Sequence, residues 1–414
     1  MNYKISVDGK QLNLEIPHNK LEIVEPEKVA VFNQEKLVRE SLKNPIDSPD
    51  LQTFLQDKED LLIIVNDGAR NTPTSIVIST IYDQIKDKNF KFIVALGTHR
   101  KPTKIEFDRI FGKYYNEFKD KILCHDSKND EMTNLGTTSR GTPVKLNSEV
   151  TKADGVIIIS SVEPHYFAGF TGGRKSFLPG VAAFESIENN HSFALLDEAK
   201  ILQLEGNPVH EDMKEAAEMV NTETFCILTV LDTNDKVFHS SSGNIHSTLK
   251  VASKKVIDVF APVVNKQADI VIAINQPPLN RNLYQSQKGL ENCKSILKEN
   301  GIFILVSCCN EGIGNNAFYE LMASSKTPDE VFQKVEKNYK LGYHKAAKFV
   351  SFMQKNKLWM VSEIEEGVLE NIFIRNFSSL QDAVDEAIAI KGEDAKMNLI
   401  QNAGITVPQI IDHI

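Results

Sequence analysis

Short apolar runs of buried-strand length recur along the chain and alternate with stretches of helical spacing. The run Leu61–Val65 is followed by a polar loop and then by Pro73–Ile85, where apolar side chains recur with the period of a helix. Five further runs predict strands at Phe92–Leu96, Gly155–Ser160, Phe225–Leu231, Ile270–Ile274 and Gly301–Cys308. Near-continuous apolar strands that alternate with helices indicate an α/β fold with mostly parallel sheets.

Both ends of the chain add elements to this pattern. Tyr3–Val7 and Gln11–Ile16 flank Asp8-Gly9, which predicts a hairpin. Lys288–Lys298 and Asp329–Asn338 have helical spacing. A helix ending near residue 262 gives way to a new strand, so we predict two α/β domains, with residues 1–265 in the N-terminal domain and residues 266–414 in the C-terminal domain.

Polar residues follow the predicted strands at their carboxyl ends. Asp67 and Arg70 follow one strand, His99 follows the next, and His165 lies just beyond a third. Ligands of open α/β sheets bind beyond the carboxyl ends of the strands. We therefore expect these side chains to share one site, in which each histidine can exchange a proton near neutral pH.

Composition narrows the function classes. The 414 residues are 41% hydrophobic and 25% charged, with a formal net charge of −9, which argues against a nucleic-acid partner. No apolar stretch has the length of a membrane span, and the first residues lack a signal-peptide pattern. The five cysteines include no CxxC motif, which favours reduced thiols. We expect a cytoplasmic protein without a membrane partner.

The segment Glu163–Ser176, EPHYFAGFTGGRKS, carries the densest candidate chemistry. Its glycines, which include Gly172 and Gly173, allow positive φ angles and a close approach to a ligand. Arg174 and Lys175 then supply cations, so the segment is suited to an anionic cofactor. The simpler interpretation is a tight turn with a solvated basic pair.

Two other functions compete with a cofactor site. GGRKS is close to a P-loop, which would make the protein a nucleotide-dependent phosphotransferase, but Arg174 stands where the motif needs glycine. Alternatively, Arg70 and Lys288 could clamp a small organic acid in a non-catalytic binding protein, since arginine's planar fork matches a carboxylate. Lys288 is expected to open a helix, where an anionic ligand would explain a cation.

Five motifs together resemble the nickel-pincer lactate racemase family of 2-hydroxyacid racemases and epimerases. They are NDGARNTP, LGTHR, EPHYFAGFTGGRKSFLPG, ESIENNH and LYQSQKG, and they span residues 66 to 289 in the family's order. The resemblance implies an isomerase with two α/β domains and an active-site cleft between them. It also implies a nickel ion held by a pincer made from a pyridinium mononucleotide.

The resemblance assigns roles to residues of this chain. His99 and His165 match the family's catalytic acid–base pair, and His191 matches its nickel ligand. Lys175 matches the lysine that can tether the cofactor through a thioamide. The other expected cofactor-binding residues are Asp67, Gly172, Gly173 and Arg174. The expected substrate-binding residues are Arg70, Tyr284, Gln285 and Lys288.

The implied reaction inverts the C2 stereocentre of a 2-hydroxy acid. The pincer accepts the C2 hydride while a histidine takes the hydroxyl proton, and return of the hydride to the other face gives the opposite enantiomer. Closure of the cleft would exclude water. The implied partners are the small-molecule substrate and the proteins that synthesise the cofactor. The substrate side chain and the oligomeric state are left open.

Overall fold

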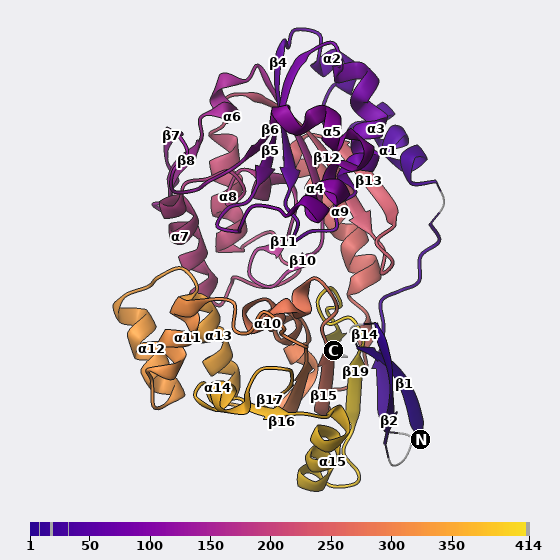
Figure 1. The fold of residues 1–414 in the computed structure, drawn as a ribbon, viewed down its shortest axis with the longest axis vertical. Coiled ribbons are helices and arrows are strands. Elements are labelled where there is room, and N and C mark those ends of the chain that lie inside the picture. The colour runs from indigo at the N-terminus through magenta and orange to yellow at the C-terminus, as the bar shows by residue number, and fades with distance from the viewer. Residues whose placement is uncertain (8, 17–19, 32, 411–414) are drawn as a thin grey trace. The chain divides into compact units, whose positions relative to one another are not determined.

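The computed structural model describes residues 1–7, 9–16, 20–31 and 33–410 (Figure 1). The chain divides into two compact units. Unit 1 comprises Met1–Glu27 and Asp258–Ile414, and unit 2 comprises Lys28–Ile257. Unit 2 is therefore an insertion in the chain of unit 1.

Unit 2 is built on a six-stranded sheet in the order β13-β12-β9-β4-β5-β6. Only β13 is antiparallel to its neighbour; the other strands pair in parallel. The strands are β4 (Asp60–Asn66), β5 (Asn89–Ala95), β6 (Ile122–Cys124), β9 (Gly155–Ser161), β12 (Glu223–Leu231) and β13 (Val237–Gly243). The main helices are α1 (Gln34–Lys43), α3 (Thr74–Ile85), α4 (Lys104–Phe111), α7 (Phe184–Ser192), α8 (Pro208–Glu218) and α9 (Ile245–Phe260).

The central strands of unit 2 are buried along their length. Every residue of β9 is buried, as is Leu61–Val65 of β4. Strands covered on both faces are apolar at nearly every position, which explains the long apolar runs in the sequence. Phe92 of β5 packs edge-on against Phe111 of α4, with 5.2 Å between the ring centroids, and such aromatic contacts join the sheet to its helices.

Unit 1 contains a second six-stranded sheet, in the order β18-β17-β16-β15-β19-β3, in which all pairs are parallel. Its strands are β3 (Leu21–Val24), β15 (Ala268–Ile274), β16 (Leu297–Val306), β17 (Lys357–Val361), β18 (Arg375–Phe377) and β19 (Met397–Ile400). Its helices are α10 (Leu283–Cys293), α11 (Asn316–Ala323), α12 (Pro328–Lys337), α13 (Tyr343–Met353), α14 (Glu366–Glu370) and α15 (Leu380–Lys391).

Shorter elements complete the two units. In unit 2, β7 (Met132–Thr137) pairs with β8 (Pro143–Asn147), and β10 (Pro164–His165) pairs with β11 (Gly169–Phe170). In unit 1, β14 (Val263–Val264) pairs with β20 (Gln409–Ile410). The short α-helices are α2 (Leu51–Phe54), α5 (Tyr115–Phe118) and α6 (Glu149–Lys152). Among the helices of the described residues, none is both long and apolar enough to cross a lipid bilayer.

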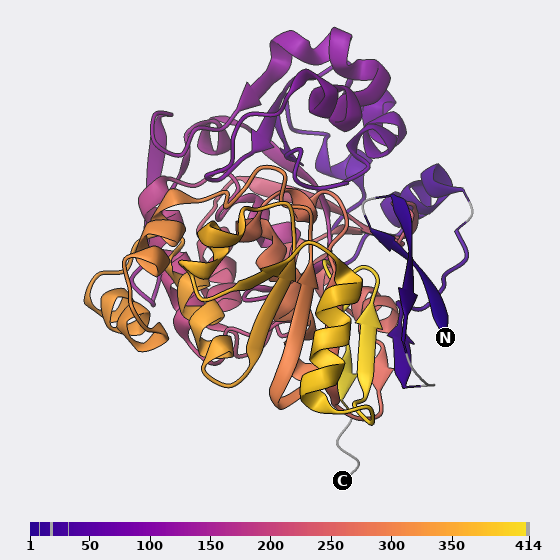
Figure 2. The ribbon, with the colours of Figure 1, turned by 60° about the horizontal axis from the view of Figure 1, so that its bottom comes forward.

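The N-terminal segment packs with the C-terminal half of the chain. The hairpin of β1 (Asn2–Val7) and β2 (Lys10–Glu15) forms as expected, although Asp8 of its turn lies outside the described residues (Figure 2). Ile5 and Leu14 are buried in the same apolar cluster as Ile272 of β15. The chain then supplies β3 to the edge of the second sheet. The expected division at residue 265 thus differs from the compact units, because residues 1–27 and 258–265 pack within unit 1.

The predicted strands are present at the expected positions, but the helix predicted at Lys288–Lys298 is wrong. Helix α10 begins at Leu283, where the side chain of Asn282 accepts a hydrogen bond from the backbone N–H of Gln285. It ends at Cys293, and Leu297 already belongs to β16. Lys288 therefore lies in the second turn of α10, so its position in the helix does not by itself require an anionic ligand.

Candidate active site

Three neighbouring strands of unit 2 carry candidate residues at their ends. Strands β9, β4 and β5 are adjacent and parallel, so their carboxyl ends lie at one edge of the sheet. Asp67 and Arg70 follow β4, His99 follows β5, and His165 follows β9. The loops are linked as well, because the backbone N–H of Gly97 donates to the carbonyl of Gly180 beyond the glycine-rich segment.

The first pair at this edge is His99 with Asp67. Nδ1 of His99 lies 2.7 Å from Oδ2 of Asp67. A carboxylate only accepts hydrogen bonds, so Nδ1 donates and Nε2 carries no proton in the neutral ring. Burial acts to raise the pKa of the Asp67 carboxyl, but the His99 contact and the charge of Arg70 lower it overall. The other oxygen of Asp67 accepts from the N–H of Ala69, so both oxygens of this carboxylate have partners within the chain and one of them orients His99.

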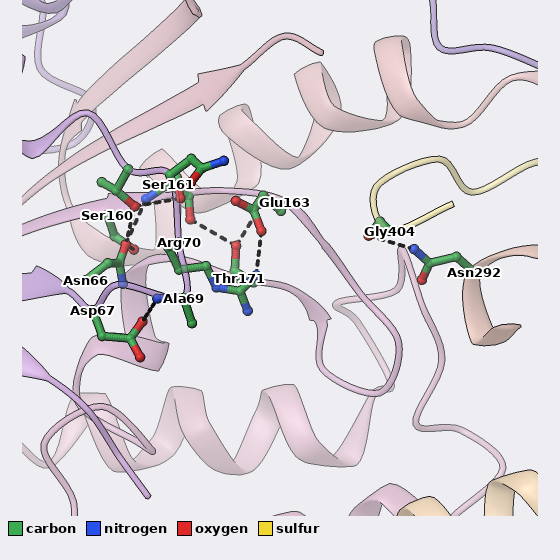
Figure 3. A network of polar contacts seen from close by, with 12 residues as sticks. Asn66, Asp67, Ala69, Arg70, Ser160, Ser161, Glu163, Thr171, Asn292 and Gly404 are labelled. Atoms are coloured by element: carbon green, nitrogen blue, oxygen red, sulfur yellow. Dashed lines mark hydrogen bonds and ion pairs between the residues drawn. The ribbon is translucent and has the colours of Figure 1, made fainter. Parts of the chain in front are cut away.

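The second pair is Arg70 with Glu163. Nη1 of Arg70 lies 2.5 Å from Oε2 of Glu163, and both side chains are about one-fifth exposed (Figure 3). Thr171 fixes the position of Glu163, since its hydroxyl accepts from the Glu163 N–H and its own N–H donates to the Glu163 carbonyl. An arginine that is expected to bind a substrate carboxylate thus already holds a carboxylate of its own chain.

A partly buried amide, that of Asn66, ties the ends of β4 and β9 together. Oδ1 of Asn66 accepts hydrogen bonds from the hydroxyls of Thr72 and Ser160 and from the N–H of Ser161 (Figure 3). The Thr72 contact spans the loop after β4, and the Ser160 and Ser161 contacts join β4 to β9, so together they hold the backbone from which Arg70 and Glu163 project.

His165 has the opposite hydrogen-bond pattern from His99. Its ring is buried, and Nδ1 accepts a hydrogen bond of 3.3 Å from the backbone N–H of Ala168. In the neutral ring the proton therefore sits on Nε2. His99 presents an acceptor at Nε2, whereas His165 presents a donor there.

The ring of Phe167 brings three candidate residues together. Its centroid lies 4.6 Å from the ring centroid of His165 and 5.1 Å from that of His191, and Nζ of Lys175 lies 5.7 Å from it. Burial and the positive charges of Arg174 and Arg70 hold the pKa of the Lys175 ammonium well below its ordinary value. The Lys175 amine and the His191 imidazole thus contact the same aromatic ring.

The glycine-rich bend requires glycine at Gly169. Its φ is +74°, and an added Cβ would lie 2.0 Å from the carbonyl oxygen of Gln203. Gly172 and Gly173 also have positive φ, at +84° and +55°. The bend is therefore a close backbone packing that side chains cannot occupy.

Arg174 differs from its expected role in cofactor binding. Its side chain is fully buried and donates to the carbonyls of its own loop, at Ala168 (2.7 Å), Phe170 (2.9 Å), Gly172 (3.2 Å) and Thr171 (3.4 Å). The guanidinium holds the bend together from inside, so it presents no donor at the protein surface.

Helix α7, which carries His191, is anchored by a buried carboxylate. Asp212 of α8 is fully buried and accepts hydrogen bonds from Thr138 (2.6 Å), Thr142 (2.9 Å) and Asn190 (2.7 Å). Because Asn190 precedes His191, this contact fixes the turn of α7 from which the imidazole projects.

The remaining candidates lie in unit 1. Tyr284, Gln285 and Lys288 are partly exposed on α10, while most of their neighbours are buried, and the i, i+3 and i+4 spacing places them on one helix face. Tyr284 packs against Phe318, and burial raises the pKa of its hydroxyl. In the same unit, the side chain of Asn292 donates to the carbonyl of Gly404 (Figure 3).

Other features of the described chain contain none of these candidates. One surface hollow of unit 1 is lined by Lys266, Lys298 and Lys396, and a second adjoins it. Within the described ranges, no group of three or more His, Cys, Asp or Glu side chains is arranged to hold a metal ion.

Comparison with known proteins identifies the family. Residues 7–202 match the model of the lactate racemase N-terminal domain, and residues 263–408 match that of the lactate racemase C-terminal domain. A lactate racemase from Thermoanaerobacterium thermosaccharolyticum is 30% identical over 423 residues, with 98% of each chain covered. The chain belongs to the lactate racemase family. A family member from Lactiplantibacillus plantarum is 29% identical over 383 residues, with 89% of each chain covered.

Solved structures agree with this family assignment. The lactate racemase apoprotein from T. thermosaccharolyticum superimposes with a TM-score of 0.91 at 28% identity, covering 99% of this chain and all of the other. A protein from Thermotoga maritima shares the fold, with a TM-score of 0.74 at 16% identity. Membership of the lactate racemase family places the chain among the isomerases and establishes the fold of two α/β domains with mostly parallel sheets.

Two residues of the site were not predicted from the sequence. Phe167 contacts His165, His191 and Lys175, and Glu163 pairs with Arg70. Both lie inside the motif EPHYFAGF, but neither has a composition or spacing that indicates a role. Only the fold of the segment reveals their contacts.

Proposed function

We propose that the protein is a racemase or epimerase of 2-hydroxy acids, with lactate as the first candidate substrate. The observation that supports this most is the arrangement of acid–base and anion-binding groups at one edge of the unit 2 sheet, in a chain of the lactate racemase family. Family membership favours this function over a phosphotransferase or a non-catalytic binding protein.

The cofactor we propose is the nickel-pincer pyridinium mononucleotide, with Lys175 as its attachment point and His191 as a nickel ligand. The lowered pKa of Lys175 fits this role, because a neutral amine can form a covalent bond whereas an ammonium cannot. Imidazole is a suitable nickel ligand, and His191 and Lys175 both contact the Phe167 ring. The chemistry that this cofactor supplies when bound is reversible acceptance of the C2 hydride.

The side chains of this protein would bind the substrate and move its hydroxyl proton. Arg70 would bind the substrate carboxylate, either in exchange for Glu163 or alongside it. Nε2 of His99, which is the acceptor nitrogen in the neutral ring whose Nδ1 donates to Asp67, would take the hydroxyl proton from one enantiomer. His165 would serve the other enantiomer from the opposite side.

The residues on α10 would complete substrate binding. Lys288 would supply a second positive charge for the carboxylate, and Gln285 and Tyr284 would supply hydrogen-bonding groups from the same helix face. This part of the proposal rests on the family resemblance and on the shared helix face. The panel of 2-hydroxy acids described next compares lactate with acids that carry larger side chains.

A panel of chiral 2-hydroxy acids tests the proposal. The full chain is produced together with the cofactor-synthesis proteins, incubated with each enantiomer, and the products are separated by chiral chromatography. We expect racemisation of lactate or a related acid that requires nickel, together with added mass on the peptide that contains Lys175. Equal racemisation by protein produced without nickel would refute the cofactor assignment.

A further inference from the structure

Arg174 is the largest fully buried side chain of the described residues, and it carries a charge. Four carbonyl oxygens of its own loop surround the guanidinium at 2.7 to 3.4 Å. All four belong to residues 168–172, which connect His165 to Lys175. The side chain therefore closes this loop from within.

The charge of Arg174 has no ion-pair partner among the described residues. Removing an arginine from water is costly unless a carboxylate compensates it. Carbonyl dipoles satisfy the hydrogen bonds but leave the net charge in place. Burial lowers the pKa of this guanidinium only to about 9, so it remains a cation at neutral pH. A neutral amide side chain could donate to carbonyls at smaller cost, so the charge itself requires an explanation.

We propose that Arg174 is a positioning residue that fixes the loop between His165 and Lys175 and places an uncompensated positive charge next to the Lys175 amine. The importance of that amine rests on the proposed function, in which Lys175 holds the cofactor. The assignment replaces the expected role of Arg174 as a direct ligand of a cofactor phosphate.

The electrostatics of the neighbouring groups agree with this geometry. The positive charges around Lys175 are those of Arg174 and Arg70, and both act with burial to lower the pKa of its amine. The charge of Arg174 also acts on His210 of α8. The pKa of His210 is lowered to about 3, mainly by burial and then by the positive charges of Arg174, His246 and Lys214. A buried charge is screened little by salt, so its influence on the neighbouring amine persists at physiological ionic strength.

Two variants separate the charge from the hydrogen bonds. Arg174→Lys keeps the charge but loses the planar fork, whereas Arg174→Gln keeps an amide donor but loses the charge. The full-length apoprotein is pulse-labelled with acetic anhydride across a pH series, and acetylation of Lys175 is quantified by peptide mass spectrometry. Lys345 of unit 1 is the internal control, because burial rather than the charge of Arg174 lowers its pKa to about 7.

We expect the labelling midpoint of wild-type Lys175 to lie well below that of ordinary lysines. Arg174→Gln should raise it by about one pH unit, which reduces labelling about tenfold below the midpoint. Arg174→Lys should leave the midpoint near the wild-type value, and Lys345 should label identically in all three proteins. Amide hydrogen exchange in residues 168–172 should accelerate in both variants.

An unchanged Lys175 midpoint in Arg174→Gln, or equal shifts in both variants, would overturn the proposal. If neither variant folds, the wild-type profile decides, because a midpoint of Lys175 at the ordinary lysine value contradicts a neighbouring uncompensated cation. The measurement uses no nickel and no substrate. Failure of the racemase assignment would therefore leave its result unchanged, and the two failures are distinguishable.

Discussion

The immediate neighbours of the two candidate catalytic histidines favour opposite tautomers of their neutral rings. Asp67 accepts from Nδ1 of His99, while the N–H of Ala168 donates to Nδ1 of His165. A base is therefore ready at Nε2 of His99, whereas His165 must give up its contact with Ala168 before its Nε2 can accept a proton. This difference predicts unequal behaviour of the two residues toward the two enantiomers.

Replacing each histidine by glutamine tests that asymmetry. We expect His99→Gln and His165→Gln each to lower kcat by about 100-fold or more for one enantiomer, with opposite preferences, because general acid–base catalysis contributes that much. The two enantiomers have equal free energies, so kcat/KM stays equal in both directions and KM must change in step with kcat. Initial rates at saturating substrate, from either enantiomer, measure the effect.

His246→Gln provides the matched control for the two histidine variants. His246 is a partly exposed histidine of unit 2 that lies 3.6 Å from Glu218 and has no assigned role in catalysis. It should retain wild-type kcat. If both site variants also retain wild-type rates, the assignment of two acid–base histidines is wrong.

At the residue scale, the sequence predicted which side chains carry chemistry better than it predicted their partners. Strand-end placement located Asp67, Arg70, His99 and His165, because parallel strands end at one edge. It could not show that Asp67 orients His99 or that Arg70 is held by Glu163, since these pairs lie 32 and 93 residues apart. The inward orientation of Arg174 was equally hidden, because adjacent basic residues usually indicate a solvated turn.

At the scale of secondary-structure elements, some turns and helices depend on close backbone contacts that glycine permits. Gly169→Ala should lower the free energy of unfolding by about 3 kcal/mol, because positive φ and overpacking act together. Its added Cβ would lie 2.0 Å from the carbonyl oxygen of Gln203. Thermal unfolding followed by circular dichroism measures the loss.

Gly141→Ala is the matched control for this turn. Gly141 has a φ of +89°, but no atom lies within 4 Å of the position of its added Cβ. Only the strain of the backbone remains, which costs about 1 kcal/mol. Equal decreases in the free energy of unfolding of the two variants would mean that the contact with Gln203 does not affect stability.

Helix α10 contains a second close approach. An added Cβ on Gly289 would lie 2.3 Å from Oδ1 of Asn275, whose amide donates to the carbonyl of Ser286 on the same helix. Alanine normally stabilises a helix by up to about 1 kcal/mol over glycine. Here we expect Gly289→Ala to destabilise the protein by about 1–2 kcal/mol, because the clash outweighs the propensity.

Gly367→Ala in α14 isolates the propensity term, since nothing lies within 4 Å of its added Cβ. It should be neutral or slightly stabilising in chemical denaturation. A stabilising Gly289→Ala variant would contradict the packing of Asn275 against α10.

The sequence predicted the type of most elements but not the limits of α10. Apolar runs gave the parallel strands their correct positions, because strands buried on both faces need apolar residues throughout. The helix predicted at Lys288–Lys298 starts and ends too late. In the structure Asn282 caps the start of α10, and Leu297 already belongs to β16. Capping by one asparagine is a weak signal beside eleven residues of helical spacing.

At the scale of the whole molecule, the chain enters unit 2 after residue 27 and leaves it before residue 258. A sequence read from one end to the other suggests two consecutive domains, which led to the predicted domain boundary at residue 265. Pairing between β3 and β19 spans more than 370 residues and has no local signature. The insertion is therefore visible only in the fold.

Two fragments test which boundary the folded protein uses. Residues 28–260 contain unit 2 with α9 complete, and we expect this fragment to be monomeric and to unfold cooperatively. Residues 1–265 add β1 to β3 without their partner strand β19, which leaves strand edges and apolar side chains such as Ile5 and Leu14 uncovered. We expect this fragment to aggregate in size-exclusion chromatography. A monodisperse 1–265 fragment with the higher Tm would favour the boundary at residue 265.

The insertion also determines how the molecule would respond to mechanical load. Because residues 1–27 and 258–414 pack within unit 1, a force applied between positions near the two ends would be borne first by the contacts of β3 with β19. The inserted unit would experience no tension until those contacts break. In an optical trap, unit 2, which carries His99 and His165, would therefore be the second to extend.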